Sequence, residues 1–310
     1  MATNSHDVVI IGGGPAGMTA GIYTAREMLD TLLIEKDTCG GLPASTESIE
    51  NYPGFPDGVN GADLMAKFKQ QSERFGVKIN EFEEVRKIES QGNLIRVITD
   101  KTEYEAHALI VASGSVPKKL NVPGESEFMG KGVSYCAICD GPLYKNKDVA
   151  IIGCGNSGLQ EAGPLLGHVK TITFIEFLPY MTAEKILQDR LQKNPKTKFL
   201  LNHALTAING KNIVDSVTVK DRKTGEEKKI SLSGVFIYAG FIPNSKFLEG
   251  IADLDKYKYI VTNEDMQTSV PGIFAVGDIR SKKVRQIDSA CADATIAAIA
   301  ARDYIKEIKK

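Results

Sequence analysis

The sequence predicts an α/β protein with two Rossmann-like, three-layer domains, and three observations lead to that prediction. One pattern of strand, glycine-rich loop, helix and strand occurs twice, beginning near Val8 and again near Val149. At 310 residues the chain is long enough for two medium-sized domains. Its composition, with 42% hydrophobic and 25% charged residues, is that of an ordinary globular protein.

The first copy of the pattern is "DVVIIGGGPAGMTAGIYTAREMLDTLLIEK". A β-branched run, Val8–Ile11, enters the glycine loop GGGPAG at 12–17, and a helical pattern follows. A second apolar run, Leu32–Ile34, then ends in the acidic residue Glu35. This order predicts a β-α-β unit.

The second copy is "DVAIIGCGNSGLQEAGPLLGHVKTITFIEF". Here the run Val149–Ile152 enters the loop GCGNSG at 153–158. A helical pattern follows again, and the run Ile172–Ile175 ends in Glu176. The second copy therefore has every part of the first.

Each part of this pattern has a physical reason. The first glycine permits a tight turn, the second lets the backbone approach a pyrophosphate, and the third allows close packing of helix on strand. The phosphates then bind the unpaired N–H groups of the helix, and the acid accepts hydrogen bonds from ribose hydroxyls. A single match is weak, but two matches in full context predict that the chain binds two dinucleotides.

Two further segments suggest a flavin in the first domain. "ALIVASGSVP" (Ala108–Pro117) predicts an apolar strand that meets a turn of small residues, which suits the close passage of a ligand. "TSVPGIFAVGDIR" predicts a buried strand, Ile273–Val276, followed by Gly277 and Asp278. An aspartate at that place binds a hydroxyl chain or caps a helix, and the sequence leaves both roles of Asp278 open.

The cysteines point to redox chemistry. The segment "YCAICDG" holds Cys136 and Cys139, a CxxC pair that could be a staple, half of a metal site or a working dithiol. No second CxxC or paired histidines complete a zinc site, so we predict no metal. With five cysteines and no disulfide framework, a working dithiol is favoured. Cys39 and Cys291 are expected to be small buried side chains.

The bulk properties exclude some functions. A net charge of −1 argues against a nucleic-acid-binding surface, which needs a basic excess. The apolar runs are too short or too rich in glycine to span a bilayer, so we expect no membrane association. The first residues, "MATNSHD", do not resemble a secretory signal, and a cytoplasmic location is expected.

Taken in order, "GGGPAG", "ENYPGF", "ASG", "CAICDG", "GCGNSG" and "GIFAVGD" resemble the low-molecular-weight thioredoxin reductases, from about Asp7 to about Ile305. The resemblance implies a split FAD-binding domain, 1–116 and 247–310, with an NAD(H)-binding domain, 117–246, inserted in it and carrying the CxxC. The boundaries fall near "GSVPKKLNVPGE" and "AGFIPNSK", which both contain turn residues.

The resemblance also implies roles for single residues. Cys136 would attack the substrate disulfide, Cys139 would face the flavin, and Asp140 would act as the acid–base group. The residues implied to bind FAD are Gly12, Gly14, Pro15, Ala16, Gly17, Glu35, Lys36, Gly41, Asn51, Ala112, Gly114, Gly277, Asp278, Arg285, Gln286 and Ile287. The residues implied to bind NAD are Gly153, Gly155, Asn156, Ser157, Gly158 and Glu176.

The activity implied is that of an FAD-dependent disulfide reductase. Electrons would pass from NADH through FAD and the Cys136–Cys139 dithiol to thioredoxin or a glutaredoxin-like protein. A homodimer is also implied. The chemistry suits the residues, because a thiolate is the nucleophile in disulfide exchange and a nearby carboxylate can move its proton.

The second fingerprint departs from the NADPH-using members, which have a basic cluster after the second strand. Here the segment is "TFIEFLPYMTAEKI", with Glu176 at the strand end and no Lys or Arg before Lys185. A carboxylate binds both ribose hydroxyls but repels a 2′-phosphate, so NADH is predicted rather than NADPH. This segment most resembles the flavoprotein subunit of alkyl hydroperoxide reductase.

Two alternatives remain open. Some thioredoxin-reductase-like flavoproteins take electrons from ferredoxin or another donor instead of NAD(P)H. Leu42 in place of a usual glutamine, and "RQIDSACADATIAA" in place of a glycine-bearing segment, keep that alternative open. An alternative of another class is a flavin-bound redox sensor whose CxxC reports oxidation without turnover.

Overall fold

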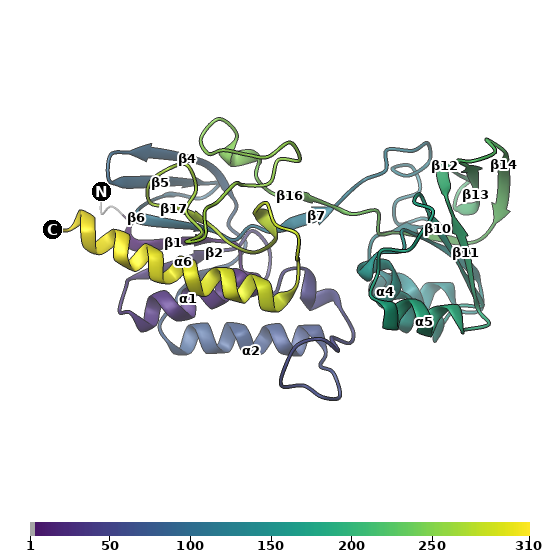
Figure 1. The fold of residues 1–310 in the computed structure, drawn as a ribbon, viewed down its shortest axis with the longest axis horizontal. Helices are drawn as coiled ribbons and strands as arrows, with labels where there is room; N and C mark the ends of the chain where they lie inside the picture. The colour runs from purple at the N-terminus through teal and green to yellow at the C-terminus, as the bar shows by residue number, and fades with distance from the viewer. Residues whose placement is uncertain (1–3) are drawn as a thin grey trace. The chain divides into compact units, whose positions relative to one another are not determined.

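The computed structural model describes residues 4–310, so Met1–Thr3 of the predicted first domain lie outside the described residues. The chain forms two compact units (Figure 1). The first unit contains the residues up to Val116 together with Ile242–Lys310, and the second contains Pro117–Phe241. The second unit is thus an insertion in the sequence of the first.

The second boundary differs from the predicted one. The sequence placed it between residues 246 and 247, whereas the compact units divide between 241 and 242. The reason is a set of hydrogen bonds that ties Asn244 to the first unit. The backbone N–H of Asn244 donates to Gly114 O (3.0 Å), and its side-chain Nδ2 donates to Ser113 O (2.9 Å).

A mostly parallel sheet forms the centre of the first unit, in the order β3-β2-β1-β6-β5-β4, with β17 also paired to β6. Strands β1, β2, β3, β6 and β17 run parallel, and β4 and β5 are antiparallel additions. The strands are β1 (Asn4–Ile11), β2 (Thr31–Ile34), β3 (Lys78–Asn80), β4 (Val85–Gln91), β5 (Leu94–Thr99), β6 (Glu103–Val111) and β17 (Ile273–Ala275). The predicted strands at 8–11, 32–34 and 273–276 lie within or beside these bounds.

Helix α1 packs against both α2 and α6 along one face of this sheet (Figure 1). The helices are α1 (Pro15–Arg26), α2 (Gly61–Arg74) and α6 (Ile287–Ile308), with the 3₁₀ turns η1 (Leu42–Ser45), η3 (Lys246–Leu248) and η4 (Gly277–Ile279). Helix α6 includes residues 289–308, where alanine and isoleucine recur at helical spacing. It begins in a capping box, in which Gln286 and Ser289 bond each other's backbone N–H.

The alternation of side chains along β1 builds two cores. Val8 and Ile10 point into the core shared with α1, α2 and α6. Val9 and Ile11 point into the opposite core, which contains side chains of β4, β5 and the segment around Leu248. All four are buried, as period-two alternation predicts for a strand covered on both faces.

The second unit has a five-stranded parallel sheet, in the order β11-β10-β9-β15-β8, and a three-stranded antiparallel sheet, β12-β13-β14. The parallel strands are β8 (Val133–Ser134), β9 (Asp148–Ile152), β10 (Thr171–Glu176), β11 (Thr197–Leu201) and β15 (Gly234–Ile237). The antiparallel strands are β12 (His203–Gly210), β13 (Val214–Asp221) and β14 (Glu227–Ser231). Two short strands, β7 (Ser115–Pro117) and β16 (Phe241–Pro243), pair where the chain passes between the units.

The parallel sheet of the second unit is the middle of three layers. One face packs on α4 (Asn156–Leu166) and α5 (Lys185–Gln192), through side chains such as Ile151 and Phe174. The other face packs on the antiparallel sheet, through side chains such as Ile152 and Val217. The unit also holds the short helix α3 (Ala137–Asp140) and the 3₁₀ turn η2 (Gly141–Tyr144).

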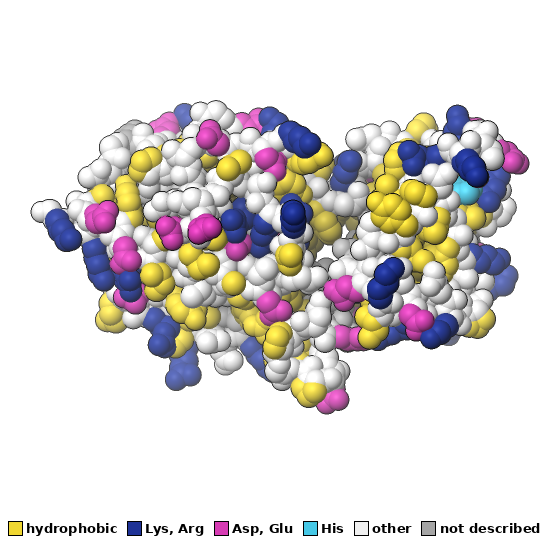
Figure 2. Space-filling view, viewed as in Figure 1, with side chains coloured by type: hydrophobic (Ala, Val, Ile, Leu, Met, Phe, Trp, Pro, Cys, Tyr) yellow, Lys and Arg dark blue, Asp and Glu magenta, His cyan; other side chains and the backbone are white. Residues whose placement is uncertain are grey.

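Charges of both signs are interspersed on the face of each unit that Figure 2 shows, in keeping with the near-zero net charge. Within residues 4–310, no helix has the length and hydropathy that crossing a membrane requires.

Candidate active site

The first glycine loop joins β1 to α1 with backbone geometry that only glycine permits. Gly12 has φ +107°, and a Cβ on it would lie 2.4 Å from Ala112 O. A Cβ on Gly17 would lie 1.8 Å from Gly12 O, so helix and loop touch directly. Above Gly14 there is space, because its nearest neighbour would be Gly41 Cα at 4.0 Å. The loop therefore leaves room for a ligand at its second glycine.

Glu35 stabilises this loop from the end of β2. Its carboxylate accepts hydrogen bonds from the backbone N–H of Gly13 (2.6 Å) and of Asp37 (3.0 Å). Helix α1 starts at Pro15 with no side-chain cap, so its first N–H groups keep free capacity toward the space above Gly14. The acid, the helix start and the glycines thus meet as the sequence predicts.

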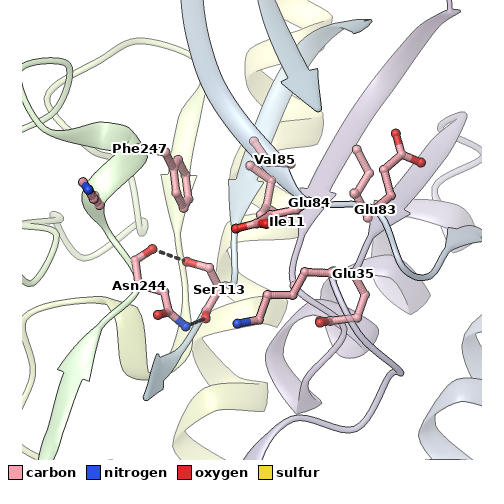
Figure 3. A pocket seen from close by; sticks show the side chains of 12 residues that line it. Ile11, Glu35, Glu83, Glu84, Val85, Ser113, Asn244 and Phe247 are labelled. Atoms are coloured by element: carbon pink, nitrogen blue, oxygen red, sulfur yellow. Dashed lines mark hydrogen bonds between the residues drawn. The ribbon is translucent and has the colours of Figure 1, made fainter. Parts of the chain in front are cut away.

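A cavity of about 200 Å³ lies beside this loop, at the ends of the parallel strands (Figure 3). Glu35 and Lys36 line it after β2, and Glu83, Glu84 and Val85 line it after β3. Ser113 and Asn244 close another side; the Ser113 hydroxyl donates to Asn244 O (3.1 Å), as the dashed line in Figure 3 shows. The sequence had not singled out the Glu83–Val85 segment, since nothing in its local pattern marks a binding residue.

Glu83 is buried and is held by its own neighbours. It accepts hydrogen bonds from the Thr99 hydroxyl (2.7 Å), the Tyr104 hydroxyl (3.2 Å) and Asn80 Nδ2 (3.1 Å). Because the carboxylate is satisfied, it fixes the wall of the cavity.

The predicted flavin-side residues come together from distant parts of the chain. Asn51 Nδ2 donates to Gln286 Oε1 (3.2 Å) across 235 residues of sequence. Asp278 lies inside η4, whose N-cap is Val276, so the alternative in which Asp278 caps a helix is wrong. Burial raises the pKa of Asp278.

Arg285 also has unused hydrogen-bonding capacity there. Its guanidinium lies 4.2 Å from the ring centroid of Tyr259, and its buried Nε has no hydrogen-bond partner among residues 4–310. An unpaired buried donor is costly, so it marks a place where a ligand acceptor fits.

The second glycine loop repeats the first almost bond for bond. Gly153 has φ +108°, and a Cβ on it would lie 2.3 Å from Tyr238 O. A Cβ on Gly158 would lie 2.3 Å from Gly153 O. The carboxylate of Glu176 accepts from the backbone N–H of Cys154 (2.6 Å) and of Leu178 (2.8 Å), as Glu35 does in the first loop.

The segment after β10 covers this second loop. The backbone N–H of Thr182 donates to Cys154 O (3.1 Å), and the Thr182 hydroxyl lies 3.5 Å from the position of a Cβ on Gly155. Asn156 Nδ2 donates to Glu184 Oε1 (3.2 Å), and Glu184 N donates to Asn156 Oδ1 (2.8 Å). The predicted residue Asn156 is therefore engaged by a neighbouring side chain.

The structure adds one cation that the sequence pattern missed. Arg222, at the end of β13, places its guanidinium 3.6 Å from the ring centroid of Phe177 and donates to Phe177 O (2.8 Å). Phe177 directly follows Glu176 and is exposed. A count of Lys and Arg along the strand could not find Arg222, because it is brought there from 45 residues away.

Cys136 and Cys139 form a disulfide, with a Cα–Cα distance of 5.4 Å, at the start of α3. Cys139 is exposed, and Cys136 and Asp140 are half-buried. The backbone N–H of Cys139 donates to Cys136 Sγ (3.2 Å), so Cys136 is both the N-cap of the helix and half of the disulfide. This arrangement can accept two electrons and then attack another disulfide.

Two side chains hold the backbone of this turn through three hydrogen bonds. The Ser134 hydroxyl accepts from Cys136 N (3.0 Å) and donates to Cys136 O (3.1 Å). The Tyr238 hydroxyl accepts from Ala137 N (2.9 Å). Burial raises the pKa of Tyr238, and the charges of Glu161 and Asp140 raise it further, so this hydroxyl stays protonated.

The remaining cysteines are free. Cys154 is fully buried, and Cys39 and Cys291 are partly buried. Burial raises the pKa of Cys39 and of Cys154 to about 12. The Thr19 hydroxyl donates to Cys291 Sγ (3.3 Å). Among residues 4–310 no group of three or more His, Cys, Asp or Glu side chains could hold a metal ion.

Comparisons with known proteins agree with this geometry. Residues 6–294 match the pyridine nucleotide-disulphide oxidoreductase family. The chain is 41% identical over 308 residues to thioredoxin reductase of Bacillus subtilis (strain 168), covering 98% of this chain and 96% of that protein. It is 37% identical over 299 residues to the 34.2 kDa protein in the rubredoxin operon of Clostridium pasteurianum, covering 96% and 97%.

Solved structures give the same result. Thioredoxin reductase of Lactococcus lactis, in its FR conformation, matches with a TM-score of 0.95 and 39% identity, over 97% of this chain and 99% of that one. Thioredoxin reductase of T. acidophilum matches with a TM-score of 0.93 and 39% identity, over 98% and 99%. FAD and a pyridine nucleotide are typical of the family. The chain is a thioredoxin reductase-like oxidoreductase that belongs to the pyridine nucleotide-disulphide oxidoreductases and, among them, to the low-molecular-weight thioredoxin reductase family.

Proposed function

We propose that this protein is an NADH-dependent flavoenzyme that reduces the disulfide of thioredoxin or of a similar small redox protein. The observation that carries the proposal is the repetition of one glycine-loop geometry, with Glu35 and Glu176 in equivalent positions, in a chain that also holds the Cys136–Cys139 disulfide. Relatives with the name thioredoxin reductase support the choice of partner.

FAD is assigned to the first unit. The space above Gly14, the cavity at Glu35 and the unpaired Nε of Arg285 fit its pyrophosphate, its adenosine and its flavin end. When bound, FAD would accept a hydride from the nicotinamide and supply two electrons to the disulfide. The remaining predicted FAD residues keep their sequence-based assignments as part of this proposal, and the inserted domain is taken to end at Phe241.

The dithiol chemistry follows from the chain's own residues. After reduction, the Cys136 thiolate attacks one sulfur of the partner's disulfide, which forms a mixed disulfide and expels the other sulfur as a thiolate. Cys139 then attacks Cys136 Sγ, which releases the reduced partner and re-forms the Cys136–Cys139 disulfide. Asp140, next to Cys139, is proposed to hold and move the proton that this exchange requires.

The preference for NADH rests on Glu176. Its carboxylate ends β10 and would repel a 2′-phosphate at the ribose it binds. Arg222 offsets part of that repulsion, but its guanidinium is stacked on Phe177 and bonded to Phe177 O. The resemblance of this segment to the flavoprotein subunit of alkyl hydroperoxide reductase is part of the same proposal.

A donor other than a nicotinamide nucleotide is the second candidate. The observation that favours it is the cover over the second loop, where Thr182 lies against Gly155 and Glu184 binds Asn156. The relative from a rubredoxin operon is consistent with an iron–sulfur or related carrier as donor. The homodimer and the cytoplasmic location also remain part of the proposal; free thiols such as Cys39 and Cys154 suit a reducing compartment.

An anaerobic titration of the oxidised flavoprotein with NADH and with NADPH tests the donor, with bleaching of the flavin as the signal. We expect NADH to bleach the flavin at lower concentration than NADPH. Glu176→Arg should weaken the response to NADH, whereas the exposed Glu227→Arg, with the same change of charge in the same unit, should not. No bleaching by either nucleotide would leave ferredoxin-type carriers as the donors to test.

Turnover with thioredoxin tests the acceptor. Steady-state reduction of thioredoxin by the purified flavoprotein is expected. A protein that is reduced once and never turns over would instead support the redox-sensor alternative.

A further inference from the structure

Tyr238 contacts both functional segments of the second unit. It follows β15 directly, and its backbone N–H donates to Ile152 O (2.8 Å). Its carbonyl oxygen lies 2.3 Å from where a Cβ on Gly153 would be, so it packs against the second glycine loop. Its hydroxyl accepts from Ala137 N (2.9 Å). One residue therefore joins the glycine loop to the helix that carries the disulfide.

The bond to Ala137 has no ready substitute. Ala137 is the first residue of α3, and the first N–H groups of a helix have no partner within it. Its residue is only 1% exposed, so water cannot replace Tyr238 without movement of the turn. The cap position is also occupied, because Cys136 Sγ accepts from Cys139 N instead. Loss of the hydroxyl would leave a buried donor unpaired.

We propose that Tyr238 is a positioning residue for the redox-active disulfide and keeps Cys136 and Cys139 in the geometry in which the S–S bond forms. Reduction adds two electrons and two protons, breaks the S–S bond and leaves two thiols. The covalent closure of the turn is then lost, and the hydrogen bond from Ala137 to Tyr238 remains. It holds the turn so that the thiols stay close together.

The sign of the effect follows from this arrangement. Two thiols that are held close re-form a disulfide more readily than two thiols on a loose turn, because less conformational freedom is lost. Tyr238 therefore favours the disulfide over the dithiol. Removing its hydroxyl should make the disulfide easier to reduce.

A neighbouring tyrosine provides a matched control. The Tyr135 hydroxyl donates to Glu125 Oε1 (2.5 Å), and Glu125 is 1% exposed. Glu125 also accepts from the backbone N–H groups of Leu120 and Asn121. Tyr135 precedes Cys136, so its hydrogen bond to Glu125 lies outside the ring that the disulfide closes. This bond should therefore be equally strong in the oxidised and the reduced protein.

The experiment compares Tyr238→Phe with Tyr135→Phe in the FAD-loaded protein. Each variant is equilibrated with mixtures of reduced and oxidised dithiothreitol, which exchange two electrons and two protons with the Cys136–Cys139 pair. Acid quenching, denaturation and labelling with a maleimide then separate the two states. Of the five cysteines, three are free in the oxidised chain, so oxidised chains take three labels and reduced chains five.

We expect Tyr238→Phe to lower the equilibrium constant for forming the disulfide about three- to tenfold, the weight of one hydrogen bond. For a two-electron couple this raises the midpoint potential by about 14 to 30 mV. Tyr135→Phe should lower the melting temperature without moving the potential.

Phe at position 238 keeps the ring that packs on the core around Phe236, so we expect this variant to fold and to retain flavin. An unchanged potential in Tyr238→Phe, or an equal shift in Tyr135→Phe, would overturn the proposal. Because the measurement uses dithiothreitol, it does not depend on which donor reduces the flavin.

Discussion

The two glycine loops have the same backbone frame and differ in what covers them. In the first loop the covering segment is Gly40-Gly41, and Gly40 N donates to Gly13 O (2.8 Å). In the second loop Thr182 N makes the equivalent bond to Cys154 O (3.1 Å), but this segment brings a threonine hydroxyl and Glu184 with it. The frame provides dinucleotide binding in both units, and the covering side chains differ.

The same comparison explains a difference in sequence. Gly13 and Cys154 occupy equivalent positions between two glycines. A Cβ on Gly13 would lie 2.5 Å from Cys39 Sγ, so the place of a side chain is already taken by a sulfur from the covering segment. In the second loop the side chain of Cys154 itself is buried beside Glu176. Both loops thus pack a sulfur near their acid, from different places in the chain.

Alanine at the third glycine of each loop should have the largest effect. In Gly17→Ala the new Cβ meets Gly12 O at 1.8 Å, which should cost about 3 kcal/mol and release FAD. Gly158→Ala, with its contact at 2.3 Å, should disturb the second unit and leave flavin content unchanged. Flavin absorbance and thermal unfolding measure both effects.

Gly163→Ala is the control, because a Cβ there meets nothing within 4 Å inside α4, and alanine favours a helix over glycine. It should stabilise the protein slightly. Loss of flavin in Gly158→Ala would mean that the two loops do not serve separate nucleotides.

The thiols of Cys39 and Cys154 should both react slowly. A pKa of about 12 for Cys39 and for Cys154 leaves a thiolate fraction at pH 8 about 1,000-fold below that of a thiol of pKa 9. Their rates of alkylation should rise with pH up to about 12, since the raised pKa delays formation of the thiolate. Mass spectrometry after timed iodoacetamide treatment of a Cys136→Ser, Cys139→Ser chain measures this. Fast labelling of Cys39 or of Cys154 would contradict this prediction.

The two carboxylates should affect different nucleotides. Each carboxylate accepts hydrogen bonds from two backbone N–H groups. In Glu35→Gln or Glu176→Gln the amide has a single oxygen, so one of these bonds is lost. We expect this to weaken nucleotide binding by about 1.4 kcal/mol, which is tenfold in affinity. Glu35→Gln should therefore weaken FAD binding, which is measured by the release of flavin on ultrafiltration. Glu176→Gln should weaken NADH binding and leave FAD bound. Unchanged NADH binding in Glu176→Gln would show that this carboxylate does not contact the ribose.

The packing of Cys39 against Gly13 should show as coupling between the two positions. Gly13→Ala should lower the free energy of unfolding by about 2 kcal/mol, because its Cβ meets Cys39 Sγ. Cys39→Ala in the same chain removes that sulfur and should restore a large part of the loss. Denaturant unfolding of the two single variants and the double variant measures the coupling. If the changes in the free energy of unfolding were additive, the Cys39 sulfur would be shown to move aside without an energetic penalty.

Local sequence was sufficient where local backbone chemistry decides the structure. The glycines with positive φ, Gly12 and Gly153, and the β-branched runs before them identified both loops, since few other residues allow that geometry. Periodicity identified the strands near 8–11, 32–34 and 273–276, although β1 begins earlier, at Asn4. The two-unit α/β fold was predictable for that reason.

Contacts between distant segments were not predictable, because they depend on the order of strands in each sheet. The boundary at 241 depends on the hydrogen bond from the backbone N–H of Asn244 to Gly114 O. The cation at Phe177 comes from Arg222, which directly follows β13 of the antiparallel sheet.

For this protein, the sequence by itself determined that two dinucleotide loops and a CxxC pair are present, since each motif consists of residues that are close together in the sequence. Only the tertiary structure decided what surrounds them: Cys39 against the first loop, Thr182 against the second, and Tyr238 at the turn that carries the disulfide. The physical reason is that a tight turn is encoded by its own residues. A packing contact or a buried hydrogen bond requires a partner that only the folded sheet brings near.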